Sequence, residues 1–142
     1  MWKSILFVFL FSILSVAQNL KSIEISPILE KPTSGSIDMM SDGETLHVSK
    51  KPVLSLKDFT HADVNITEGQ VTLNLSLTPS AGERIKSFTS KNVGKRLAFI
   101  VNGKLLKAPK VRDPIDGKGI SIDPIDRTEA DQLADQINSQ SP

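Results

Sequence analysis

The sequence lacks cysteine and tyrosine altogether, and its aromatic residues are one tryptophan and six phenylalanines. Without cysteine, neither disulfides nor thiolate zinc sites can form, so folding must rest on apolar burial and hydrogen bonds. Trp2 and half of the phenylalanines lie near the N-terminus, which leaves Phe59, Phe88 and Phe99 for the rest of the chain. Three separated phenylalanines are too few for a platform that stacks on nucleic-acid bases. The core is therefore expected to consist of Leu, Ile and Val side chains.

An excess of charge of one sign is also missing. The chain carries 17 basic and 16 acidic residues, and the loss of Lys3 with an N-terminal leader makes the two numbers equal. Proteins that are drawn to nucleic acids or to anionic bilayers carry a basic excess. The composition therefore predicts no nucleic-acid partner and no electrostatic attraction to membranes.

Long apolar runs are absent beyond the first residues. The stretch from Ile5 to Leu14 is preceded by one lysine and followed by small residues up to Ala17. This pattern predicts a signal peptide over residues 1–17, cleaved before Gln18. A ten-residue helix spans ~15 Å, which is about half of the ~30 Å hydrocarbon core, so we expect no stable membrane insertion after cleavage. An uncleaved signal anchor is the alternative. The expected location is the periplasm or cell envelope, and secretion from the cell is also open.

Residues 18–43 show no sustained periodicity, because their apolar residues are scattered among Pro27, Pro32 and several serines. Such a segment is typical of a linker, and we expect it to be flexible apart from one short strand over residues 22–26. A single domain over residues 44–139 is expected to follow, opening with a short strand at residues 45–49.

The clearest local pattern is the alternation of apolar and polar residues from Val71 to Leu77, which predicts a half-buried strand. Residues 62–67 alternate in the same way, and Glu68-Gly69-Gln70 has the length and the glycine of a hairpin loop. Thr78 and Pro79 provide an N-cap and a first helical residue, so a helix is expected next.

The second half of the domain repeats these signals. Arg96 to Val101 predicts a central strand, Asn102-Gly103 a hairpin turn, and Lys104 to Lys107 the return strand. A short strand at residues 120–122 and a last helix from Thr128 follow, with a buried stripe of Ala130, Leu133, Ala134 and Ile137. These elements predict an α+β fold: a two-layer sandwich in which two helices cover one face of a mainly antiparallel sheet.

Motifs for catalysis are missing. The sequence has no Gly-x-Ser-x-Gly and no cysteine nucleophile. His47 in a strand and His61 in a loop are expected to be surface residues, against the alternative of a metal site or general base. Asp-Pro-Ile-Asp occurs at 113–116 and at 123–126 and offers four carboxylates to calcium, but Asp-Pro is also ordinary turn chemistry. We therefore predict no enzyme activity, no metal and no cofactor.

A resemblance to a known family rests on several short runs: Asn92 to Lys104, Ala108-Pro109, Pro114 to Gly117, and Thr128-Glu129-Ala130. Together they resemble the head subdomain of the first periplasmic domain of SecD, the auxiliary membrane subunit of the bacterial Sec protein-export machinery. The resemblance implies an α+β head that meets emerging polypeptide chains. Ile120 to Pro124 departs from the family's Ile-Ser-Gly-x-Phe loop. The positions that carry the resemblance are Gly94, Lys95, Arg96, Leu97, Asn102, Gly103, Ala108, Pro109, Thr128, Glu129 and Ala130.

The segment after the second hairpin is basic. Lys104, Leu105, Lys107, Lys110 and Arg112 form a candidate sheet edge that captures an extended polypeptide, with the lysines favouring acidic segments. The alternative is a solvated edge whose lysines prevent strand pairing.

Two functional hypotheses follow. The first is a non-enzymatic, exported binding module that contacts polypeptides, or another envelope protein, during or after export. The second is a secreted structural or interaction protein with one dedicated envelope partner, unrelated to export. Only the first predicts an export defect when the gene is deleted.

Overall fold

The computed structural model describes residues 22–140, so the predicted signal peptide and its cleavage site at Ala17 and Gln18 lie outside the described residues. The elements are β1 (Ile23–Leu29), β2 (Ser36–Ser41), β3 (Glu44–Ser49), β4 (Leu54–Ser55), the 3₁₀ turn η1 (Leu56–Asp58), β5 (Phe59–Thr67), β6 (Gln70–Leu77), α1 (Pro79–Lys91), β7 (Leu97–Val101), β8 (Lys104–Lys107), β9 (Gly119–Ile122) and α2 (Arg127–Gln140).

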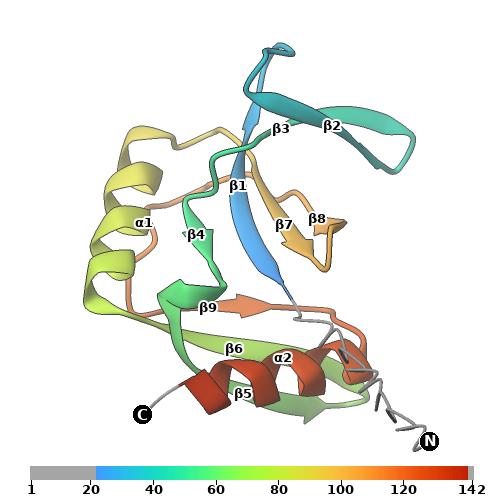
Figure 1. The fold of residues 1–142 in the computed structure, drawn as a ribbon, viewed down its shortest axis with the longest axis vertical. Coiled ribbons are helices and arrows are strands. Elements are labelled where there is room, and N and C mark those ends of the chain that lie inside the picture. The colour runs from blue at the N-terminus through green and yellow to red at the C-terminus, as the bar shows by residue number, and fades with distance from the viewer. Residues whose placement is uncertain (1–21, 141–142) are drawn as a thin grey trace, which may run out of the picture.

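The strands form two antiparallel sheets (Figure 1). The larger sheet has the order β2-β3-β1-β7-β8, with β4 pairing with β1, and the smaller sheet has the order β5-β6-β9. The predicted α+β class is confirmed. The strands divide between two sheets where the sequence predicted one, because β9 pairs with β6 while β8 pairs with β7.

Three hairpins turn through two residues that both have positive φ. These turns are Asp42-Gly43, Glu68-Gly69 and Asn102-Gly103, with φ between 49° and 81°. Positive φ at both central positions is the type I′ geometry, whose twist matches that of the flanking strands. The second and third hairpins confirm the turns predicted from the sequence.

β1 corrects the prediction of a flexible linker. Ile23 and Ile25 are 1% and 0% exposed, and β1 lies between β7 on one side and β3 and β4 on the other. Residues 23–41 therefore belong to the folded domain, which does not begin at residue 44. Pro27 concealed the strand in the sequence. Pro27 lies opposite Leu97, the first residue of β7, and just beyond it the Ile28 N–H donates to the Arg96 carbonyl at 3.2 Å.

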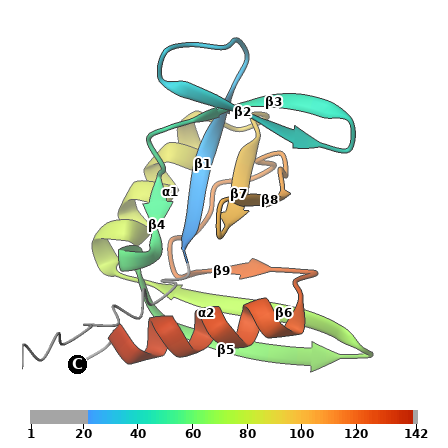
Figure 2. The ribbon, with the colours of Figure 1, turned by 45° about the vertical axis from the view of Figure 1, so that its right-hand side comes forward.

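α1 begins as predicted, with the Thr78 hydroxyl accepting a hydrogen bond from the Ala81 N–H at 3.2 Å. The helix stands beside β4 and β1 of the larger sheet (Figures 1 and 2). Arg84 fixes it there, because its Nε donates to the Val53 carbonyl at 2.8 Å and its Nη2 lies 2.7 Å from Asp58 Oδ1.

The segment that leads from β8 to β9 packs on the other side of α1. Gly82 and Gly117 meet backbone to backbone, so closely that a Cβ on either would overlap the carbonyl of the other. Thr89, which is fully buried, accepts a hydrogen bond from the Ile115 N–H at 2.9 Å. These two contacts hold the turn-rich segment in place.

α2 lies along the smaller sheet (Figure 2), mainly against β5. Its buried residues are the predicted stripe of Ala130, Leu133, Ala134 and Ile137. The two helices therefore cover different sheets, whereas the sequence predicted one shared face. A helical apolar stripe shows which side of a helix is buried but leaves open what covers it.

The structure has one main core and a smaller second one. The main core contains residues from both sheets and both helices, including Ile25, Leu73, Ile85 and Leu133. The second core lies within the larger sheet and comprises Leu46, Val48, Ala98 and Ile100, packed against Ile28, Met39, Leu105 and Ala108. It joins the β2–β3 hairpin to β7 and β8.

Candidate functional site

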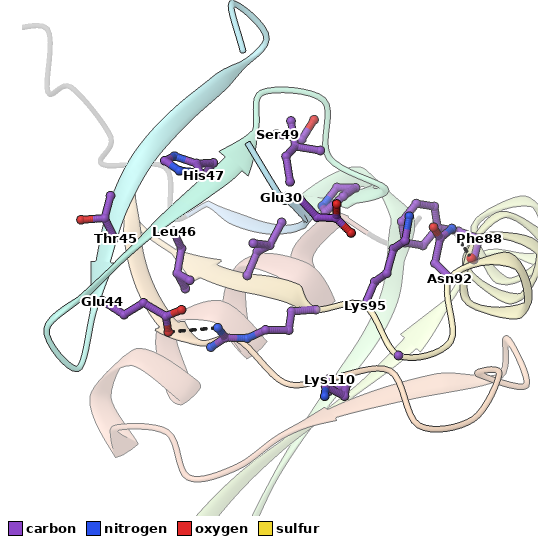
Figure 3. A pocket seen from close by; sticks show the side chains of 15 residues that line it. Glu30, Glu44, Thr45, Leu46, His47, Ser49, Phe88, Asn92, Lys95 and Lys110 are labelled. Carbon is purple, nitrogen blue, oxygen red and sulfur yellow. Dashed lines mark hydrogen bonds and ion pairs between the residues drawn. The ribbon is translucent and has the colours of Figure 1, made fainter. Parts of the chain in front are cut away.

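A groove of about 760 Å³ opens beside the β2–β3 hairpin (Figure 3). One wall is β3, and the floor is the end of β1, from Pro27 to Glu30. The facing wall consists of the end of α1, the segment Gly94 to Arg96, and Lys110. Four stretches that are distant in the sequence therefore meet in one cavity.

The floor and the α1 end supply the apolar part of the lining. Ile28, Leu29 and Phe88 are half-buried side chains that face the groove, and Leu46 from β3 closes it below. The Asn92 side-chain amide donates to the Phe88 carbonyl at 2.7 Å and so fixes the last turn of α1. The groove therefore offers apolar contacts between two polar rims.

The wall formed by Gly94 to Arg96 is held rigidly by a second segment, Pro109 to Val111. The Gly94 N–H donates to the Val111 carbonyl and the Val111 N–H to the Lys95 carbonyl, both at 2.7 Å. Arg96 and Lys110 lie opposite each other in an isolated antiparallel bridge. Backbone hydrogen bonds therefore fix the positions of three cationic residues.

One ion pair crosses the groove. Arg96 Nη1 lies 3.1 Å from Glu44 Oε2, and the dashed line in Figure 3 marks this pair. Arg96 Nε donates to the Ala108 carbonyl at 2.9 Å, which orients the guanidinium. Lys95 and Lys110 are exposed and have no ion-pair partner within the described part of the chain. One rim is therefore predominantly positive.

The structure brings some of the predicted family-motif positions to the groove and leaves others elsewhere. Gly94, Lys95 and Arg96 line it, and Ala108 and Pro109 support it through their carbonyls, which accept from Arg96 and from Leu97. The Asn102-Gly103 turn holds the start of β1 instead. Thr128, Glu129 and Ala130 form the first turn of α2 on the smaller sheet.

The five residues of the predicted polypeptide-binding edge do not form one surface. β8 is an outer strand, but Leu105 packs into the second core, and Lys107 donates to the Asp123 carbonyl at 3.0 Å. Lys104 and Arg112 are exposed outside the groove, and Lys110 alone of the five lines it. Capture of a polypeptide along β8 stays a prediction.

Both histidines face single carboxylates. His47 Nδ1 lies 2.7 Å from Asp38 Oδ1 on the neighbouring strand, and His61 Nε2 lies 3.2 Å from Asp63 Oδ1. His61 belongs to β5, which corrects its predicted place in a loop. Within residues 22–140, no three His, Asp or Glu side chains come together as a metal site.

Three carboxylates of the Asp-Pro-Ile-Asp repeats contact backbone N–H groups or a lysine. Asp116 Oδ1 accepts from the Lys118 N–H, and Asp126 Oδ2 accepts from the Glu129 N–H at the start of α2. Asp123 Oδ1 lies 3.4 Å from Lys107 Nζ. Turn and cap roles therefore account for Asp116 and Asp126, and an ion pair with Lys107 for Asp123.

Sequence reasoning missed much of the groove, including Glu30, Glu44, Thr45 and Phe88. The sequence predicts a linker before residue 44, so the floor of the groove has no place in the predicted domain. The alternation over residues 45–49, with Leu46 and Val48 buried, predicts the strand but does not show which strands lie beside it. No helix among the described residues is both long and apolar enough to cross a bilayer.

Comparison with known families shows the family to which this chain belongs. The family model described as SecDF, P1 head subdomain, matches residues 31–141. The chain belongs to this family. The predicted resemblance is thereby confirmed, and the match runs from just before β2 to the end of α2.

Relatives and solved structures agree with membership of the SecDF head family. The protein translocase subunit SecD of Thermobaculum terrenum is 33% identical over 120 residues, which are 82% of this chain and 23% of that protein. The SecD subunit of Aquifex aeolicus is 37% identical over 73 residues, 51% of this chain and 15% of that protein. The chain thus spans about a quarter or less of these curated relatives.

The fold of this chain is similar to that of solved SecDF structures. One, of a membrane component SecDF that enhances protein export, has a TM-score of 0.63 at 20% identity and covers 83% of this chain and 62% of its own. Another, SecDF in the super-membrane-facing form, has a TM-score of 0.65 at 21% identity over 83% of this chain and 18% of its own. At these identities the likeness concerns the fold.

Proposed function

We propose that this SecD-head-like chain is a non-enzymatic, exported binding module that contacts polypeptides during or after their passage across the membrane. The observation that carries the proposal is the groove between β3 and the segment Gly94 to Arg96, which is built partly from the family-motif residues. Its relatives are named as protein translocase subunits, which supports a role in export.

The edge of β3 supports an extended polypeptide as the ligand. Ser41 and Glu44 flank a two-residue turn and so exchange ladder hydrogen bonds, which directs the peptide groups of Thr45 away from β2. β1 pairs with β3 up to Leu29 opposite His47, and no further. The N–H and C=O of Thr45 therefore face the groove, where they suit the backbone of an added extended segment.

The polar groups of the groove support binding over catalysis. The lining offers His47, Glu30 and Glu44 for proton transfer and the Ser49 hydroxyl as a nucleophile. The Ser49 hydroxyl hydrogen-bonds with the backbone of Lys51, and Glu44 pairs with Arg96. Covalent catalysis needs a nucleophile within hydrogen-bond reach of its base, so the groove is better suited to hold a ligand than to change it.

The predicted signal peptide over residues 1–17 supports an extracytoplasmic location, and the family described by its periplasmic head supports the same side of the membrane. The periplasm or the cell envelope is therefore the proposed place of action. The second hypothesis, a dedicated envelope partner unrelated to export, has no support from the comparisons, since the relatives are translocase subunits.

Site-specific crosslinking tests the proposal. A photocrosslinking amino acid replaces Thr45 in the groove or, as a matched control, the exposed Thr67 at the end of β5 on the smaller sheet. In cells that contain an export substrate arrested midway, position 45 is expected to crosslink to the arrested chain and position 67 is not. Equal labelling from both positions, or none from position 45, contradicts the proposal. Deletion of the gene is expected to slow export of a reporter.

A further inference from the structure

We propose that the groove prefers extended segments that carry Asp or Glu, and that Glu44 occupies the place on Arg96 that a ligand carboxylate takes. The inference rests on the proposed function, since it names the chemistry of the polypeptide that the groove accepts. Glu44 then competes with the ligand carboxylate for Arg96.

The first argument is the arrangement of positive charge. Arg96 and Lys110 are directly opposite each other in a β-bridge, and like charges in that position destabilise a sheet. Lys95 is adjacent, and the backbone hydrogen bonds between Gly94, Lys95 and Val111 prevent the segments from moving apart. Such a locally unfavourable arrangement is expected where an external anion compensates for it.

The second argument is how the Arg96 guanidinium is already hydrogen-bonded. Its Nε is committed to the Ala108 carbonyl, which points the two terminal nitrogens toward the groove. Planar guanidinium groups bind carboxylates through two parallel N–H donors. Glu44 uses one of these nitrogens, so the recognition of a carboxylate is already present in the resting protein.

The third argument is that Glu44 can be displaced. It is the first residue of β3, beside the hairpin turn, and its side chain is 60% exposed. An ion pair this exposed is weak, because water screens it and ordering long side chains opposes it. A ligand carboxylate that takes the place of Glu44 is also attracted by Lys110, which lies opposite Arg96 in the β-bridge.

Glu30 limits where the acidic residue can lie. Glu30 ends the floor of the groove and has no ion-pair partner among residues 22–140. A ligand carboxylate near Glu30 is repelled, while one near Arg96 is attracted. Charge therefore selects acidic segments and also sets the direction in which they lie across β3.

Three labelled peptides of equal length and equal apolar content test the inference, one neutral, one with two Glu residues and one with two Lys residues. They are titrated against the protein as recovered from the cell envelope, and binding is followed by fluorescence anisotropy. The acidic peptide is expected to bind most tightly and the basic one most weakly, with a difference that disappears at high salt. The substitution Glu44→Gln is expected to tighten the acidic peptide about two- to fivefold.

Control variants separate charge from folding. Glu83→Gln, on the exposed side of α1 and outside the groove, is expected to change nothing. Lys95→Gln and Lys110→Gln, both at exposed positions, are expected to remove the preference for the acidic peptide. Arg96→Lys keeps the charge but loses the planar fork, and is expected to weaken the acidic peptide.

The outcomes distinguish this inference from the proposed function. If the neutral or basic peptide binds as tightly as the acidic one, or if Glu44→Gln leaves the acidic peptide unchanged, the preference is overturned. Neutral-peptide binding that is lost on Thr45→Trp but kept on Thr67→Trp still supports a groove for polypeptides. If none of the three peptides binds, both proposals fail.

Discussion

Asn138 in α2 forms two hydrogen bonds with the backbone of Ala62 in β5. Its side-chain Nδ2 donates to the Ala62 carbonyl, and its Oδ1 accepts from the Ala62 N–H, both at 2.9 Å. Because Thr67 and Gln70 flank the hairpin turn, the peptide groups of Ala62 point away from β6. The asparagine therefore takes the place of a neighbouring strand at the free edge of the smaller sheet.

Replacement of this asparagine is expected to be costly. Asn138→Ala leaves both backbone groups of Ala62, a residue that is 2% exposed, without a partner. We expect a loss of about 1–3 kcal/mol in the free energy of unfolding, measured by urea denaturation. Asn65→Ala, at an exposed position of the same strand, is the control and should change stability much less. Equal effects of the two substitutions contradict the edge role.

The close contact between Gly82 and Gly117 predicts that an alanine at position 82 destabilises the protein, although alanine favours a helix more than glycine does. In an unobstructed helix, Gly82→Ala would stabilise by ~1 kcal/mol. Here the new methyl group overlaps the Gly117 carbonyl, so we expect destabilisation by about 1–3 kcal/mol and a lower melting temperature. Ser87→Ala, at an exposed position of α1, should be neutral or slightly stabilising. A stabilised Gly82→Ala variant shows that the segment does not pack on α1.

The place of β1 in the core predicts that its isoleucines are essential. Ile25 is 0% exposed, so Ile25→Ala should lower the free energy of unfolding by about 2–5 kcal/mol. Ile37→Ala, at a side chain that is 45% exposed, removes the same atoms and should cost far less. If the Ile25→Ala variant unfolds at the same urea concentration as the parent, residues 23–29 behave as a linker after all.

Local patterns predicted the parts of the fold that depend on neighbours in the sequence. The alternation from Val71 to Leu77, the cap at Thr78 and the turn at Asn102-Gly103 all correspond to observed features. Each depends on a few consecutive residues, whose conformational preferences agree with the final structure. The type and the approximate limits of most elements after residue 44 were therefore predictable.

The features of the fold that could not be predicted depend on strand pairing between residues that are distant in the sequence. β1 has three isoleucines and a proline, and it becomes a central strand because β3, β4 and β7 all pair with it. The division into two sheets has the same origin, since apolar alternation shows the buried face of a strand and leaves its neighbours undetermined. The groove combines residues near positions 30, 45, 90 and 110, so Arg96 was found by its motif while Glu44 was missed.

The measurement that tests the central claim most directly is a map of backbone amide NMR shifts on addition of an unfolded polypeptide. A groove that binds extended chains predicts the largest changes at Thr45, Lys95 and Arg96, with little change at Asn65 and other exposed positions of β5. Shift changes confined to the smaller sheet and α2, or no shift changes up to a large molar excess of the polypeptide, contradict the claim.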